Sequence, residues 1–143
     1  MNITTALILV HFLLFVYTFR FQRTTLGISR QALGQGSAQY QGVLTPSWMG
    51  ILGWAQTGLY IIAIVMVFLT YGWLYAIGYV VGSQIGYSMF DAITPFPSYT
   101  YCFNVIKRHI NSEMAKANDD EARQSLEMIL ASVVRSETEA AAG

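Results

Sequence analysis

The chain has 143 residues, of which 54% are hydrophobic and only 11% are charged, and its formal net charge is zero. A zero net charge argues against nucleic-acid binding, which requires a basic face. Residues 31–106 contain no Lys or Arg, and their only charged side chain is that of Asp91. Such a gap is typical of a chain that crosses a lipid bilayer, and three crossings leave no room for a large catalytic domain outside it.

The first apolar run covers residues 3–19, with aliphatic and aromatic side chains on all faces of a helix. No Lys or Arg precedes it and no small-residue cleavage site follows it, so we interpret it as a retained membrane span. Its one polar interruption is His11. Imidazole is a common metal ligand, and His11 is therefore a candidate ligand for haem or chlorophyll. The alternative is a histidine that hydrogen bonds with Ser, Thr or Tyr of a neighbouring helix.

Two further apolar runs follow a segment rich in Gly, Gln, Ser and Thr at residues 20–46, which predicts a polar loop. The second span is predicted at residues 47–70 and the third at residues 73–94, where Pro95 stops the helix. Only Tyr71 and Gly72 separate these two spans. So short a connection predicts a tight antiparallel hairpin.

Small residues recur along both helices of this hairpin. Gly78, Gly82 and Gly86 share one face of the third span, and the second span carries Gly53 and Gly58. In lipid, small residues at this spacing let two helix backbones approach closely. We predict a glycine zipper that packs the third span on the second, with self-association between copies as the alternative.

The opposite face of the third span is polar, with Gln84, Ser88 and Asp91. Polar side chains in a span usually face protein or water, so these three can line a polar path or bind an ion. Because Asp91 lies in the last turn of the span, we favour a place at the membrane boundary, where its carboxylate pairs with Arg20 or Arg23.

Residues 98–136 predict an amphipathic helical hairpin, and residues 137–143 a disordered end. Ser98 is a candidate N-cap of the first tail helix, and Asn118 with Glu121 resembles a capping box that opens the second. Two helices alone bury little apolar surface. We therefore predict that four apolar side chains of the second tail helix dock on another subunit: Leu126, Ile129, Leu130 and Val133.

The eight Lys and Arg residues lie either within residues 20–30 or after the third span. Lys and Arg near the ends of spans are retained on the cytoplasmic side of a membrane. The sequence thus predicts an all-α, multi-pass integral membrane protein with three transmembrane helices, its N-terminus outside and its C-terminus in the cytoplasm.

No group of residues predicts catalysis, since Cys102 has no histidine within one helical turn in the sequence, and we do not expect an enzyme. The leading hypothesis is a small accessory or structural subunit of a larger membrane complex, with other integral membrane subunits and the bilayer as partners. The first alternative is a self-assembling pore or channel, because the layout is similar to that of one class of phage holins. The second is a haem- or chlorophyll-binding subunit of a redox or photosynthetic complex, through His11.

Overall fold

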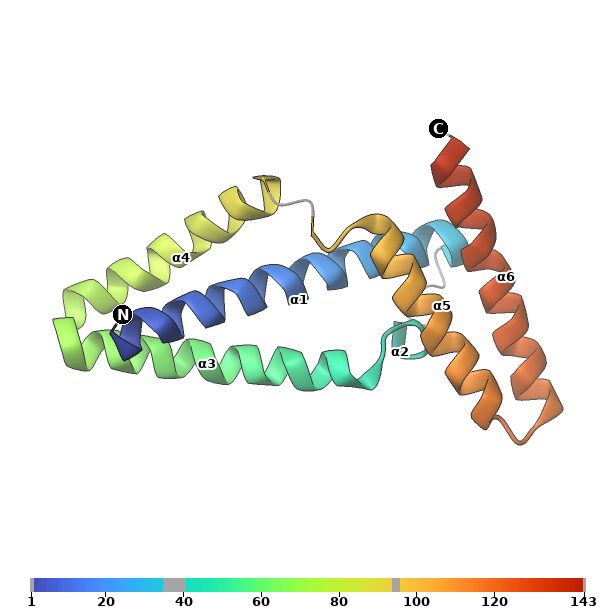
Figure 1. Ribbon diagram of the computed structural model, residues 1–143, viewed down its shortest axis with the longest axis horizontal. Helices are drawn as coiled ribbons and strands as arrows, with labels where there is room; N and C mark the ends of the chain where they lie inside the picture. Colours follow the sequence, from blue (N-terminus) through green and yellow to red (C-terminus); the bar gives the residue numbers. More distant parts are fainter. Residues whose placement is uncertain (1, 35–40, 94–95, 143) are drawn as a thin grey trace. The chain divides into compact units, whose positions relative to one another are not determined.

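The computed structural model describes residues 2–34, 41–93 and 96–142, and every regular element in these ranges is an α-helix. The predicted all-α class is confirmed. Figure 1 shows the six helices in chain order: α1 (Ile3–Leu33), α2 (Gln41–Leu44), α3 (Ser47–Tyr71), α4 (Trp73–Ile93), α5 (Tyr99–Lys116) and α6 (Asp120–Ala142).

The helices are divided between two compact units. Unit 1 comprises Met1–Arg20 and Trp48–Phe96, and therefore contains the first part of α1 together with α3 and α4. Unit 2 comprises Phe21–Ser47 and Pro97–Gly143, which hold the rest of α1 with α2, α5 and α6. Each unit has its own buried side chains.

Two helices, α1 with 31 residues and α3 with 25, are long and apolar enough to cross a membrane. The helix α4 is not among them, although it has 21 residues, because its Gly, Ser, Gln and Asp residues lower its mean hydropathy. Gly72 alone connects α3 to α4 and has a φ of 94°, a left-handed conformation that favours glycine. The third span remains a prediction.

The helix α1 continues to Leu33, so residues 20–33 are helical where the sequence predicts a loop. The reason is burial in unit 2: the side chains of Phe21, Thr25, Ile28 and Ser29 share one face of the helix and are all buried. Two of these four side chains are small and polar, so residues 20–33 do not show the regular spacing of apolar residues that predicts a helix. Gly34, with a φ of 67°, follows the last residue of the helix.

The core of unit 2 forms where α5 and α6 pack together. The buried side chains of α5 are Cys102, Phe103, Ile106 and Ile110, and those of α6 include Ile129 and Val133. Phe21 and Ile28 of α1 and Leu44 of α2 are also fully buried in this unit.

The ends of α5 and α6 agree with the prediction from the sequence at one position and differ from it at two. The Ser98 hydroxyl accepts a hydrogen bond from the backbone N–H of Tyr101 at 3.2 Å, so the predicted N-cap is confirmed. The predicted capping box starts at Asn118, whereas the capping side chain in the structure is that of Asp119, one residue later. Its carboxylate accepts a hydrogen bond from the backbone N–H of Glu121 at 3.2 Å. The helix α6 also continues to Ala142, where a disordered end is predicted.

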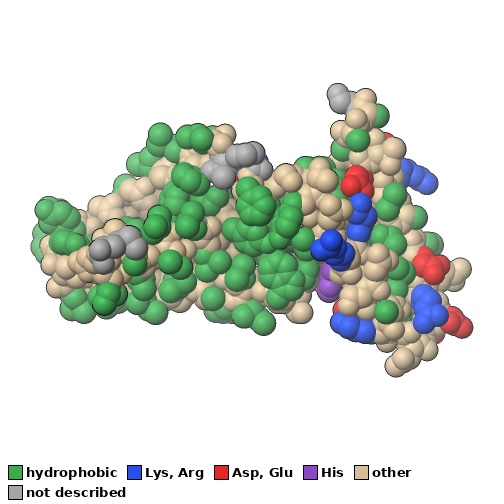
Figure 2. All heavy atoms as spheres, in the orientation of Figure 1, with side chains coloured by type: hydrophobic (Ala, Val, Ile, Leu, Met, Phe, Trp, Pro, Cys, Tyr) green, Lys and Arg blue, Asp and Glu red, His purple; other side chains and the backbone are tan. Residues whose placement is uncertain are grey.

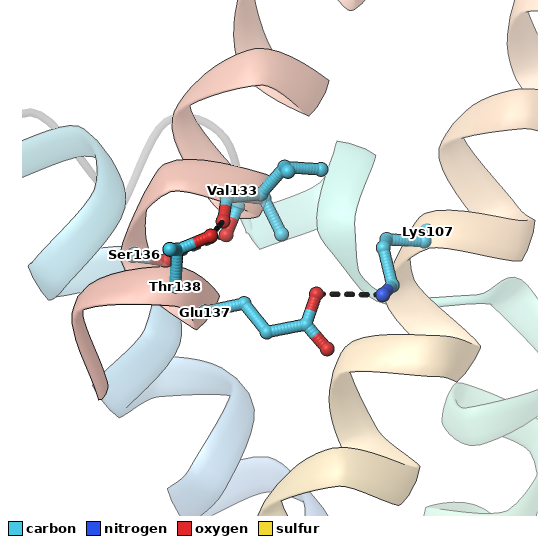
Figure 3. A network of polar contacts seen from close by, with 6 residues as sticks. Lys107, Val133, Ser136, Glu137 and Thr138 are labelled. Atoms are coloured by element: carbon cyan, nitrogen blue, oxygen red, sulfur yellow. Dashed lines mark hydrogen bonds and ion pairs between the residues drawn. The ribbon is translucent and has the colours of Figure 1, made fainter. Parts of the chain in front are cut away.

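An ion pair accounts for part of this longer α6. Figure 3 shows the Lys107 ammonium of α5 donating to the Glu137 carboxylate of α6 at 2.6 Å. One residue earlier, the buried Ser136 hydroxyl donates to the backbone carbonyl of Val133. The alanines that follow have a high helix propensity, which favours continuation of the helix.

Replacement of Phe103 by alanine is expected to destabilise unit 2 by about 3–5 kcal/mol, because the ring is buried against other apolar side chains. The measurement is the rate of tryptic cleavage of the full chain in detergent, since the Lys and Arg residues after Arg20 all lie in unit 2. Met128→Ala is the control, because the Met128 side chain is 64% exposed. Equal cleavage rates for the two variants would contradict the assignment of Phe103 to the core.

Candidate functional site

The most unusual feature of unit 1 is a buried polar cluster around His11. This histidine lies in α1, is only 1% exposed, and is surrounded by side chains of α3 and α4. The nearest polar side chains are Gln56 of α3 and Tyr79 and Tyr87 of α4. Three helices therefore supply groups to one site.

Both nitrogens of the imidazole have hydrogen-bonding groups within reach. The hydroxyl oxygens of Tyr87 and Tyr79 lie 2.9 and 3.1 Å from Nδ1. The same Tyr87 hydroxyl lies 3.3 Å from Nε2, and the amide nitrogen of Gln56 lies 3.5 Å from Nε2. A neutral imidazole has one donor and one acceptor nitrogen, so this set of hydroxyl and amide groups can satisfy either tautomer.

Aromatic rings fix the positions of these groups. The ring of Tyr60 is stacked on that of His11 with centroids 4.8 Å apart and planes at 16°. Phe15 is stacked on Tyr87 with centroids 3.8 Å apart, and Phe12 packs against Tyr87 at 5.2 Å. Each phenol thus presents an apolar ring to its neighbours and a hydroxyl to the cluster.

A second polar contact continues the cluster between α3 and α4. The Tyr60 hydroxyl lies 3.2 Å from the Ser83 hydroxyl, which donates to the backbone carbonyl of Val80 at 2.9 Å. Ser83 is buried. The cluster as a whole can exchange protons only among an imidazole and neutral hydroxyls, and its clearest physical effect is to hold α1, α3 and α4 in one arrangement.

This geometry does not fit His11 as an axial ligand of haem or chlorophyll. A metal ligand must present the lone pair of one ring nitrogen to the metal, with space for a macrocycle beside it. Here each nitrogen faces a hydroxyl or an amide, and Tyr60 covers one face of the ring. The alternative from the sequence, a histidine satisfied by tyrosines of a neighbouring helix, matches these contacts.

The polar residues predicted on α4 lie outside the His11 cluster. Gln84 and Ser88 are exposed, and the Ser88 hydroxyl donates to the carbonyl of Gln84 in its own helix. Asp91 pairs with Arg20, as predicted: the guanidinium lies 3.7 Å from the carboxylate and donates to the backbone carbonyl of Asp91 at 2.8 Å. This pair joins α1 to the end of α4.

The predicted glycine zipper between α3 and α4 is not what the structure contains. A Cβ added at Gly58, Gly78 or Gly82 would meet no heavy atom within 4 Å. At Gly86 it would lie 3.6 Å from the Phe12 ring, which belongs to α1. Gly53 is half-buried in α3, where its carbonyl accepts from the hydroxyl of Thr57. Within the chain, therefore, Gly78 and Gly82 leave open space on α4.

The predicted docking residues of the tail are partly used inside the chain. Ile129 and Val133 are buried in unit 2, and Leu126 and Leu130 are half-buried. The prediction assumed a tail of two helices, whereas the second half of α1 and the short α2 also belong to this unit. Ile129 and Val133 therefore offer no exposed docking surface.

Most members of the cluster were not predicted from the sequence, although the sequence contains a signal for them. Tyr79, Ser83 and Tyr87 are spaced four residues apart and share a face of α4, as Gln56 and Tyr60 do on α3. Attention to hydroxyl-bearing aromatics, rather than to Gln84 and Ser88 alone, would have selected this face.

Comparisons of the chain with models of protein families, with curated proteins and with solved structures find no match. Among the described residues, no group of three or more His, Cys, Asp and Glu side chains is placed to hold a metal ion.

Replacement of Tyr87 by phenylalanine is expected to destabilise unit 1 by about 0.5–1.5 kcal/mol, because it keeps the stacked ring and removes the hydroxyl beside His11. The measurement is thermal unfolding in detergent, in a double-mutant cycle with His11→Ala. Tyr75→Phe is the control, since the Tyr75 side chain is 64% exposed. Strictly additive effects of the two cluster substitutions would show that the hydroxyl and the imidazole do not interact.

Proposed function

We propose that this chain is a small integral membrane protein that crosses the bilayer three times, through α1, α3 and α4. We also propose that it serves as an accessory subunit of a larger membrane complex. The proposal has two parts, membrane insertion and assembly with other subunits, and each has its own support.

The observation that carries membrane insertion is the inverted polarity of unit 1. His11, Thr4, Thr18 and Ser83 are buried, whereas Trp54 is 80% exposed and many aliphatic side chains are exposed with it. Hydrophobic side chains cover much of the visible surface over α1, α3 and α4 in Figure 2. Water disfavours such a surface, whereas hydrocarbon accepts it and requires polar groups to be satisfied inside.

The same reasoning supports α4 as the third span. Its 21 residues reach about 30 Å at a rise of about 1.5 Å per residue, which matches the hydrocarbon core of a bilayer. Its buried polar side chains Ser83 and Tyr87 have partners in the His11 cluster, and Asp91 is paired near the helix end. The distribution of Lys and Arg supports an outer N-terminus and a cytoplasmic C-terminus.

Two exposed faces of α4, one with glycines and one with polar side chains, support assembly with other subunits. Gly78 and Gly82 leave bare backbone on the glycine face, and a helix of another chain can approach such a surface closely. Gln84 and Ser88 are also exposed, and polar side chains in a span usually face protein rather than lipid. In the tail, which the proposal places on the cytoplasmic side, Met128 and Val134 are exposed apolar side chains of α6.

A self-assembling pore is the second candidate, and the observation that favours it is the exposed polar pair on the opposite face of α4. A ring of copies in which this polar face is turned inwards would bring Gln84 and Ser88 towards a shared interior. Leakage of a trapped dye from liposomes that contain only this chain distinguishes the pore from the accessory subunit.

Membrane insertion predicts that alkaline carbonate leaves the chain in the membrane pellet, because the apolar surface of unit 1 remains in lipid. With the predicted orientation, a cysteine in Tyr71→Cys reacts with an impermeant maleimide on intact cells, and one in Ser125→Cys reacts only after permeabilisation. The unaltered chain is the control, since its single cysteine, Cys102, is buried. Labelling of Ser125→Cys on intact cells would reverse the orientation.

Gly82→Leu is expected to remove bound subunits from the chain in mild detergent, since the leucine occupies the space a partner helix needs. The fold itself is expected to tolerate this change, because a Cβ at position 82 would meet no heavy atom of the chain within 4 Å. Gly50→Leu is the matched control, as Gly50 of α3 also faces open space. The measurement is complex size with the set of co-purified proteins; no difference between the two variants would remove the assigned role of the glycine face of α4.

A further inference from the structure

Unit 2 contains an open pocket of about 470 Å³, formed by the segment from α2 to the start of α3, the last turns of α5, and α6. Its polar side chains are a lysine, a glutamate, a histidine and two hydroxyl groups, and an aliphatic side chain of α6 adds an apolar wall. These residues are Thr45, Ser47, His109, Glu113, Lys116 and Leu126.

The two charged groups of the pocket are exposed to solvent and form an ion pair with each other. Lys116 donates to one carboxylate oxygen of Glu113 at 2.8 Å, and their side chains are 67% and 39% exposed. This hydrogen bond lowers the pKa of Glu113, which is therefore ionised at neutral pH. An exposed ion pair contributes little to stability, so both groups can turn to a ligand at small cost. His109 lies one helical turn before Glu113 on the same face of α5.

Chain connectivity places this pocket beside the membrane surface. Ser47, in its wall, is the first residue of α3, which is apolar enough to cross a bilayer. The next residue, Trp48, is exposed, as is Trp54 two turns later, and exposed tryptophans are enriched at the depth of lipid headgroups. A helix that crosses the membrane from Ser47 onwards leaves the pocket at headgroup depth.

We propose that the pocket binds a phosphate ester that carries a primary ammonium group, supplied by the headgroup of phosphatidylethanolamine. Lys116 and His109 donate to the phosphate together with the hydroxyls of Thr45 and Ser47, while the free oxygen of Glu113 accepts from the ammonium group. Leu126 lies against the apolar part of the lipid. This inference rests on the membrane insertion proposed above.

The carboxylate of Glu113 gives the site its selectivity. A primary ammonium group donates charge-assisted hydrogen bonds to a carboxylate, whereas the trimethylammonium group of phosphatidylcholine has no hydrogen to donate. The headgroup of phosphatidylglycerol has the same phosphate but no cation, so its hydroxyls donate only weaker hydrogen bonds to Glu113 and leave its charge unpaired. The pocket therefore distinguishes three common headgroups through one side chain.

The experiment adds phosphatidylethanolamine, phosphatidylcholine and phosphatidylglycerol in equal amounts to the full chain in mild detergent, and native mass spectrometry measures which lipid is retained. Preferential retention of phosphatidylethanolamine is expected. Lys116→Gln is expected to reduce that retention by about tenfold, the effect of losing one hydrogen bond to a charged group. Glu113→Gln is expected to abolish the preference over phosphatidylcholine.

Arg108→Gln is the matched control, because Arg108 is an exposed cation of α5 that does not line the pocket. Equal retention of the three lipids, or an equal loss in Arg108→Gln and Lys116→Gln, would overturn the proposal. Binding of soluble phosphoethanolamine without retention of the lipid would overturn the lipid as its source. If carbonate releases the chain from membranes, the proposed function fails; if the chain stays in the pellet yet retains no phosphatidylethanolamine preferentially, only the pocket assignment fails.

Discussion

The arrangement of unit 1 depends on the need to satisfy one imidazole inside an apolar environment. An unsatisfied polar group there is costly, and in hydrocarbon no water can take the place of a missing partner. The partners of His11 come from α3 and α4, more than forty residues away along the chain. Only an arrangement that brings all three helices together meets this requirement, and the stacked rings of Phe15 and Tyr60 then fill the space around it.

Unit 2 depends on a different balance. Its buried side chains are mostly aliphatic and aromatic, and Figure 2 shows charged side chains of both signs on its visible surface over α5 and α6. This is the polarity of a domain in water. The chain thus combines a part suited to hydrocarbon with a part suited to water, and the proposed lipid pocket lies in the water-suited part at the residue where the next apolar helix begins.

Local signals made several features predictable. A serine followed by an amphipathic run predicted the cap at Ser98, and a lone acid near the end of an apolar run limited the partners of Asp91 to two arginines. The length of α1 was not predictable in the same way, because Thr25 and Ser29 are buried in its second half and resemble loop residues. The His11 cluster required knowledge of which helix faces meet. Hydrophobic periodicity does not supply that knowledge when apolar residues surround a helix on all sides.

The open glycines of α4 have a consequence for how the purified protein behaves. Glycine in a helix is about 1 kcal/mol less favourable than alanine in water, and at Gly78 and Gly82 nothing inside the chain would clash with a methyl group. The isolated chain is therefore less stable than the same backbone would be with alanine at these two positions. A screen for higher expression or heat resistance would select alanine at these two positions, and under the assembly proposed above its most successful products would be those least able to recruit neighbours in the bilayer.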